Sequence, residues 1–212
     1  MKRLTLTILT ASLLVAAPAH AQWLHFGLRG GVNVAGAEAK GTAFSGDTGT
    51  RTGYHLGLVG LVDISSWFAI QTEVWYSKKG FSQGDGSVAL DLTYVEIPVL
   101  AVVKLGLPLS PRLFTGPVLG LESGCDVTFQ GEKENCDDAE EGAPRTKGAD
   151  SGIIFGAGLG FDFGPGMLTG DVWYNHGLTD IGERSNDVDS IETATWYFSA
   201  AYMLTLGSDR GR

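Results

Sequence analysis

From about residue 23 onward, the sequence repeats one pattern of alternating apolar and polar or small residues, interrupted by turns and polar loops. A period of two is typical of β-strands whose two faces meet different environments. Eight such segments lie near residues 23–35, 53–62, 67–79, 94–105, 112–122, 152–163, 167–176 and 194–206. The pattern therefore predicts an all-β fold of eight antiparallel strands.

The connections between these segments alternate in length. Tight turns are expected near residues 63–66, 106–110 and 164–166, and polar loops near residues 37–50, 78–90, 124–150 and 179–193. Short turns that alternate with long loops are typical of outer-membrane β-barrels, whose turns lie in the periplasm and whose loops lie outside. An even number of strands then places both chain termini in the periplasm.

The two faces of the predicted strands differ in charge. One face has no Asp, Glu, Lys or Arg, and a cation at mid-bilayer costs about 2 to 4 kcal/mol, so this face is expected to contact lipid. The other face carries the charges expected in the barrel interior: Arg29, Glu73, Glu96, Arg112, Asp162 and Asp171. A soluble barrel that holds an apolar ligand would have the opposite polarity. The prediction is an eight-stranded antiparallel transmembrane up-and-down β-barrel.

Two finer features accompany this assignment. Aromatic residues stand near the strand ends on the lipid-facing side, as in an interfacial belt: Tyr54, Phe68, Tyr76, Phe163, Tyr174 and Trp196. Residues 90–92 alternate in the opposite phase to the strand that follows them, and a β-bulge near Thr93 would reconcile the two.

The N-terminus has the features of a secretory signal peptide. Lys2 and Arg3 precede an apolar run over residues 4–17, and small residues follow at 19–21, which predicts cleavage before Gln22. The expected domains are a signal peptide over 1–21 and an outer-membrane barrel over 22–212. Loss of the two cations changes the formal net charge from −9 to −11. An acidic chain without a basic cluster is not expected to bind nucleic acid.

Three segments resemble a known family. Tyr94-Val95-Glu96-Ile97-Pro98-Val99-Leu100 is similar to the "YLEIPLLL"-type strand of small outer-membrane β-barrel domain proteins, a porin-like family. Residues 172–182, with Tyr174, Gly177 and Leu178, resemble that family's "RYxxGLxxIG" segment, although Trp173 stands where an arginine is usual. Residues 116–120 resemble its fifth strand. The resemblance implies an eight-stranded barrel and no common biochemical activity.

Cys125 and Cys136 lie in the longest predicted loop and are expected to form a disulfide in an oxidising compartment. A metal-binding pair is the alternative, which their wide spacing and the lack of a nearby histidine disfavour. The same loop contains a group of carboxylates: Asp126, Glu132, Glu134, Asp137, Asp138, Glu140 and Glu141. We interpret them as a solvated acidic surface, and a divalent cation that bridges them to lipopolysaccharide is the alternative.

Three functional hypotheses remain. The first is a structural or surface-interaction barrel that acts through its external loops, and the second is a small transport pore through the lumen. The third is a lipid-modifying enzyme that uses His55 or His176, but neither has a serine two residues away. The sequence has no nucleophile elbow, phosphate loop or zinc spacing, so no catalytic residue, metal or cofactor is expected.

The expected partners follow from the predicted location. They are outer-membrane lipid, lipopolysaccharide and, during insertion, the barrel assembly machinery. The chain does not end on the terminal aromatic residue of such barrels, so the stretch 198–204 is the expected assembly signal. A monomer is expected.

Overall fold

The computed structural model describes residues 24–40, 49–83, 88–107, 109–129, 132–136, 148–178 and 190–206. The predicted signal peptide and its cleavage site lie outside these ranges. The strands are β1 (Leu24–Lys40), β2 (Gly49–Asp63), β3 (Phe68–Gln83), β4 (Val88–Lys104), β5 (Ser110–Phe129), β6 (Glu132–Asn135), β7 (Ala149–Phe163), β8 (Gly166–Gly177) and β9 (Ser190–Leu206). Within the described ranges, no helix has the length and apolar character that a membrane crossing requires.

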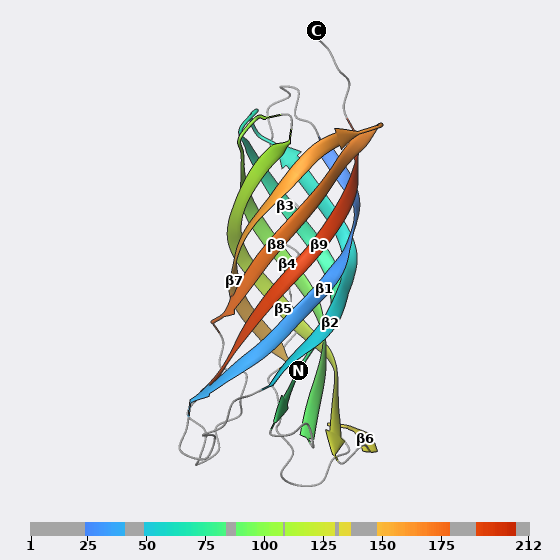
Figure 1. Cartoon of the computed structure of the whole chain (residues 1–212), viewed down its shortest axis with the longest axis vertical. Coiled ribbons are helices and arrows are strands. Elements are labelled where there is room, and N and C mark those ends of the chain that lie inside the picture. Colours follow the sequence, from blue (N-terminus) through green and yellow to red (C-terminus); the bar gives the residue numbers. More distant parts are fainter. Residues whose placement is uncertain are drawn as a thin grey trace, which may run out of the picture.

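Eight of these strands form a closed antiparallel barrel. The sheet order is β4-β3-β2-β1-β9-β8-β7-β5, and a further pairing of β4 with β5 closes the ring. The short strand β6 pairs with the far end of β5, from Asp126↔Asn135 to Phe129↔Glu132, and lies beyond the barrel wall (Figure 1). The eight-stranded barrel predicted from the sequence is therefore confirmed, and the additional hairpin strand β6 was not predicted.

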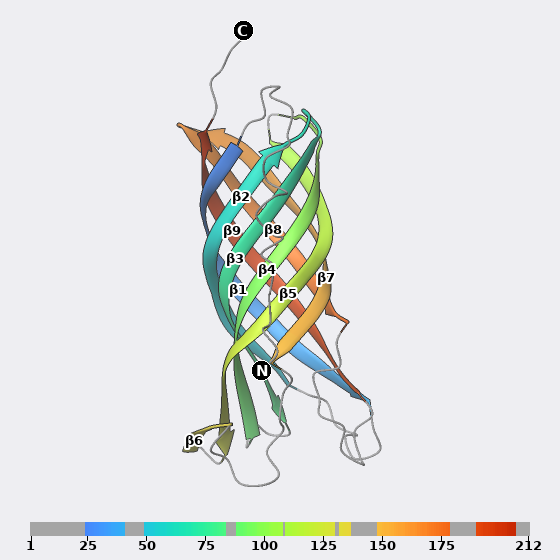
Figure 2. The ribbon, with the colours of Figure 1, turned by 180° about the vertical axis from the view of Figure 1, so that it is seen from behind.

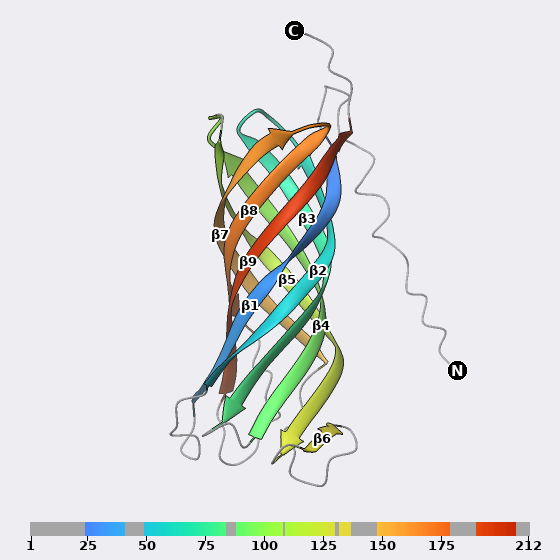
Figure 3. The same cartoon turned by 45° about the vertical axis from the view of Figure 1, so that its right-hand side comes forward.

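The two ends of the barrel differ. Short turns join Asp63 to Phe68, Lys104 to Ser110 and Phe163 to Gly166 at the end that is uppermost in Figure 1, which we call the turn end. Leu24 and Leu206 pair at this end, so the barrel both begins and finishes there (Figure 3). Gly106 and Gly164 have φ of 60°, a backbone conformation that favours glycine in tight turns.

The opposite end, which we call the loop end, is uneven. Strand β8 ends at Gly177, whereas β5 runs for 20 residues and continues past the end of β7 towards β6 (Figure 2). All four predicted loops, at 37–50, 78–90, 124–150 and 179–193, are therefore partly strand, because β1 runs to Lys40 and β9 begins at Ser190. The second and third of them are the most affected. Their residues continue the β3–β4 and β4–β5 ladders, for example Gly80↔Asp91 and Leu90↔Val127. The wall is thus extended at two places, by the β3–β4–β5 ladders and by the β1–β9 ladder, which continues to Lys40↔Ser190.

The two faces of the wall have the polarity that the sequence predicts. Leu28 is 62% exposed on the outer face, whereas its neighbour Arg29 is 1% exposed in the lumen. Other large apolar residues are exposed on the outer face of the remaining strands, and together they form an apolar band: Leu56, Leu58, Val74, Val99, Leu113, Leu119, Phe155, Leu159, Val172 and Phe198. Aromatic pairs flank the band, with Tyr174–Trp196 nearer the loop end and Phe163–Tyr202 nearer the turn end.

A β-bulge does lie next to Thr93, but it does not change which face the residues of β4 occupy, as the sequence had suggested. Strand β4 keeps its phase, so Leu92, Tyr94 and Glu96 are all buried. Thr93 pairs with Gly124 but Tyr94 pairs with Glu122, which leaves Ser123 of β5 as the extra residue. The bulge is therefore on the neighbouring strand, and Leu92 packs against Cys125 in a small apolar cluster at the loop end.

Candidate functional site

The lumen is the candidate site because it gathers most of the buried charged and aromatic side chains. At the turn end, Lys104 Nζ donates a hydrogen bond to Asp63 Oδ1 over 2.6 Å. His25 Nε2 lies 3.4 Å from Asp63 Oδ2, and Thr205 Oγ1 lies 3.1 Å from the other ring nitrogen of His25. Further into the barrel, fully buried apolar side chains fill the cross-section: Val59, Leu61, Ala69, Leu100, Val102 and Met203.

A network of buried charges lies next towards the loop end. Arg29 donates from Nε to Glu73 over 3.0 Å and from Nη1 to Asp171 over 2.7 Å. Arg112 lies 3.3 Å from Asp171 Oδ1 and donates its Nη2 to Gln71. Four of the predicted interior charges therefore form one network across β1, β3, β5 and β8. The side chains of Arg29, Glu73 and Asp171 have no exposed surface, so each charge depends on its partners.

Aromatic rings close the lumen beside this network. The Trp75 ring centre lies 5.1 Å from that of Trp173 and 5.4 Å from that of Tyr197, and Phe114 lies 4.6 Å from Trp173. The His55 ring packs edge-on against both Trp75 and Tyr197, with ring centres 5.1 and 5.2 Å away. These rings come from β2, β3, β5, β8 and β9, so they fill the lumen from most of its wall.

Glu96 stands apart from the central network. Its Oε1 lies 2.7 Å from Lys79 Nζ, and its Oε2 accepts a hydrogen bond from the Tyr197 hydroxyl over 3.0 Å. Sequence reasoning did not assign Lys79 to the interior. The signal was available, because the buried face of the third predicted strand contains Gln71, Glu73, Trp75 and Ser77, and the next residue in that series is Lys79.

Asp162 is the exception among the predicted interior charges. It is exposed and pairs with Met167, next to the turn between β7 and β8. The physical reason is its position at the rim, where an inward-facing residue still meets solvent. The correct face was assigned, but not a buried environment.

The two histidines considered for catalysis lie on opposite faces of the wall. His55 is 2% exposed inside the lumen, and neither of its ring nitrogens has a hydrogen-bond partner among the described residues. His176 is exposed on the outer face, where its ring stacks against Tyr174 with centres 6.4 Å apart. The structure therefore does not bring these two histidines together.

In the two family-like segments, some residues face the lumen and others face the outside of the barrel. Tyr94, Glu96 and Pro98 are buried in the lumen, whereas Ile97 belongs to the outward series. In the second segment Tyr174 faces outward, Gly177 pairs with Gly152, and the Leu178 N–H donates to the Ser151 carbonyl over 2.8 Å. These residues thus form part of the barrel wall and mark the point at the loop end where β8 stops.

The projecting hairpin of β5 and β6 is closed by the predicted disulfide. Cys125 and Cys136 are bonded, with Cα atoms 5.4 Å apart, and Cys136 N–H donates to the Cys125 carbonyl. Lys133 pairs with Asp126 at 2.9 Å, and this hydrogen bond raises the pKa of Lys133. The described residues include no group of three or more His, Cys, Asp or Glu suited to a metal. Asp137, Asp138, Glu140 and Glu141 lie outside the described residues.

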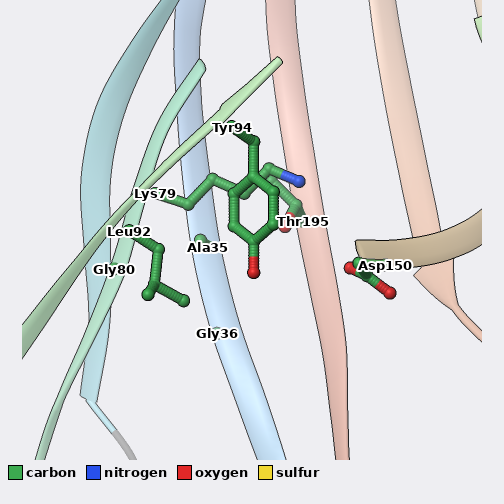
Figure 4. Close-up of a pocket in the computed structure, with 8 residues that line it drawn as sticks. All are labelled: Ala35, Gly36, Lys79, Gly80, Leu92, Tyr94, Asp150 and Thr195. Atoms are coloured by element: carbon green, nitrogen blue, oxygen red, sulfur yellow. The ribbon is translucent and has the colours of Figure 1, made fainter. Parts of the chain in front are cut away.

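A small pocket opens at the loop end of the lumen, beyond the Lys79–Glu96 pair. Its lining includes Leu92 and Tyr94 from β4, Lys79 from β3 and Thr195 from β9. Figure 4 shows the Tyr94 hydroxyl pointing into the space between Leu92 and Asp150. The candidate site therefore consists of a filled lumen with one recess at its loop-end mouth.

Comparison with known proteins gives a family and a fold. The family described as outer membrane protein beta-barrel domain matches residues 20–183. No curated protein matches the sequence. The outer membrane protein OprG from Pseudomonas aeruginosa has 11% identity and a TM-score of 0.54, over 89% of this chain and 97% of that chain. At this identity the likeness concerns the fold alone.

Two further solved structures are similar over most of their length. Ail, the attachment invasion locus protein of Yersinia pestis, solved in complex with the heparin analogue sucrose octasulfate, has 15% identity and a TM-score of 0.45. The alignment covers 85% of this chain and 99% of Ail. AlkL, solved in DMPC lipid bilayers, has 15% identity and a TM-score of 0.47, over 92% of this chain and 96% of that chain.

Proposed function

The chain belongs to the outer membrane protein β-barrel domain family, and from that premise we propose that it is a non-catalytic, non-conducting barrel that acts at the cell surface through its loop end. The turn end then lies in the periplasm, with both ends of the barrel sequence. The apolar band contacts outer-membrane lipid, and the loop-end segments meet lipopolysaccharide and the exterior.

The filled lumen is the observation that carries this proposal. Apolar side chains, the Arg29 network, the aromatic rings and the Lys79–Glu96 pair follow one another along the axis. An eight-stranded barrel is just wide enough for such side chains, so a filled interior stiffens it and blocks solute flow. The accessible chemistry is then at the loop end, where β5 and β6 project as a disulfide-closed hairpin.

Conductance in planar bilayers tests the filled lumen. The purified mature chain is expected to give no steady current. A variant with Trp75→Ser and Trp173→Ser removes two central rings and is expected to stay closed as well, because the apolar layer and the Arg29 network still fill the lumen. Both proteins are first checked for folding by the heat-dependent gel shift. Stable ion currents from the unmodified chain at neutral pH would instead support a small transport pore.

Complementation of a deletion strain tests the surface role. One chain has residues 125–136 replaced by a short Gly-Ser turn, and a matched control has the exposed turn residue Ser66 replaced by glycine. The hairpin replacement is expected to lose the envelope or adhesion phenotype that the unmodified chain restores, and the turn control is expected to keep it. Full activity of the hairpin replacement would contradict a surface role for this segment.

A further inference from the structure

We propose that the pocket at the loop-end mouth binds the ammonium group of a small primary alkylamine. This inference goes beyond the surface role proposed above and does not depend on which partner the hairpin contacts. It rests on buried oxygen atoms without partners, on the charge balance at the mouth and on the apolar wall of the pocket.

Two oxygen atoms at the mouth are buried and have no hydrogen-bond partner among the described residues: the Tyr94 hydroxyl and Glu122 Oε2. Tyr94 is only 2% exposed. Tyr94 pairs directly with Glu122 across the β4–β5 ladder, so these two side chains lie on the same side of the wall. Buried polar atoms are normally hydrogen-bonded, and a pair of orphan oxygens therefore marks a place for a donor.

Asp150 lies close to the same point. A Cβ atom built on Gly120 would lie 3.4 Å from Tyr94 Cδ1 and 3.8 Å from Asp150 Cβ, so the ring and the aspartate meet over this glycine. Asp150 also lines the pocket into which the Tyr94 hydroxyl points (Figure 4). The lining of the recess thus includes a phenol and the Asp150 carboxylate, and Glu122 lies next to Tyr94 on the neighbouring strand.

The charges favour a cation over a neutral donor. Lys79 is the one ammonium that lines the described pocket, and it is already paired with Glu96 at 2.7 Å. Its charge is therefore matched, and the Glu122 carboxylate adds a further negative charge beside the recess. A partly buried carboxylate is stabilised by a positive partner that also donates hydrogen bonds.

An alkylammonium group fits better than a metal ion. Calcium takes about six to eight oxygen ligands, and the described residues offer no group of three or more His, Cys, Asp or Glu for a metal. The rest of the wall is apolar or small, from Leu92, Ala35, Gly36 and Gly80. The enclosed volume of about 20 Å³ is close to that of one water molecule, so the pocket admits an ammonium head and leaves the methylene chain at its opening.

Calorimetric titration of the full mature chain in lipid nanodiscs tests this assignment. The probes are n-butylammonium, putrescine and N-acetyl-lysine amide, with n-butanol as the neutral analogue and CaCl2 as the metal alternative. Binding of the amines without binding of butanol is expected. Butylammonium and putrescine alone would indicate a free amine, whereas lysine amide binding would indicate a lysine side chain of a partner protein.

Two variants identify the site. Tyr94→Phe and Glu122→Gln each preserve the side-chain shape, and each is expected to weaken amine binding by about tenfold or more, as for loss of a hydrogen bond to a charged group. Asp126→Asn is the matched control, because its carboxylate is paired with Lys133 on the hairpin and is expected to leave binding unchanged.

A second measurement uses the unmodified chain. In methyl-labelled protein, the butyl chain is expected to give nuclear Overhauser contacts to the Leu92 methyl groups. The proposal is overturned if no amine binds, if butanol binds as well as butylammonium, or if calcium binds in its place. It is also overturned if the Tyr94 and Glu122 variants bind as tightly as the Asp126 variant, or if Leu92 shows no contact.

Discussion

The guanidinium carbon of Arg29 lies 4.7 Å from the centre of the Trp173 ring, and the two side chains come from β1 and β8. The segment that residues 172–182 resemble has an arginine where this chain has Trp173. Here β1 supplies the cation, which donates to Asp171 on β8 while the Trp173 ring covers it. A desolvated cation–π contact of this kind is worth about 2 kcal/mol, so Trp173 stabilises the lumen although it replaces the usual arginine.

Arg29→Met is expected to destabilise the barrel strongly. Without Arg29, the buried carboxylates of Glu73 and Asp171 have only Arg112 as a nearby cation among the described residues. Breaking a buried ion pair costs about 3 to 5 kcal/mol. The free energy of unfolding is measured by urea titration in lipid vesicles. The double variant with Glu73→Gln removes the surplus carboxylate and is expected to recover part of the loss. A double variant no more stable than Arg29→Met would contradict the network.

Leu159→Arg is expected to impair folding into lipid, at a cost of about 2 to 4 kcal/mol for a cation in the bilayer. Leu159 is 50% exposed within the apolar band. Ser66→Arg is the control, because Ser66 is exposed in a turn outside the band. Gly158 is unsuitable as a lumen control, since a Cβ there would overlap Asp171 and the Gly170 backbone. Equal folding of the two arginine variants, read by gel shift, would mean that the band does not face lipid.

Replacement of both cysteines by serine is expected to loosen the hairpin and leave the barrel intact. The disulfide closes a separation of 11 residues beyond the barrel wall, and a loop of this order contributes about 3 kcal/mol or less. The test is trypsin cleavage at Lys133, whose side chain is 53% exposed, together with the heat-dependent gel shift. Faster cleavage with an unchanged shift is expected, and reduction of the unmodified chain should reproduce it. A barrel that no longer folds would show that the disulfide has a wider role.

The orientation is tested with single cysteines at the two ends. Leu178→Cys lies just after β8 at the loop end, and Ser66→Cys lies in a turn at the opposite end. A membrane-impermeant maleimide added to whole cells is expected to label position 178 but not position 66. Permeabilisation of the outer membrane should then allow labelling at both. Labelling of Ser66→Cys in sealed cells would reverse the assignment.

Which face each residue occupies could be predicted from the sequence, because a two-residue period assigns faces without knowledge of neighbours. Leu28 and Arg29 follow this rule, and so do Leu56 and His55. The tight turns were predictable for a similar reason, since Gly106 and Gly164 mark positions where the chain needs φ of 60°.

Contacts across the lumen could not be predicted in the same way. Which residues meet depends on the stagger between strands, and the stagger is set by the whole ring. Glu96 therefore meets Lys79 and Tyr197, while Arg29 meets Glu73 and Asp171. The extension of β5 beyond the apolar band was also not predicted. Beyond the band, inward-facing apolar residues such as Leu92 and Cys125 pack against each other, so an alternating pattern there no longer distinguishes a lipid-facing side from a polar lumen.

The filled lumen has a consequence for the order of events during biogenesis. With the loop end outside, the finished barrel offers the hairpin no passage, because Trp75, Trp173 and the Arg29 network occupy the interior. In that orientation we expect the hairpin to reach the cell exterior before the β4–β5 and β5–β7 ladders are complete. The disulfide joins two adjacent strands and makes the hairpin no wider than a strand pair. We therefore expect that oxidation in the periplasm is compatible with later translocation and that the ring closes last.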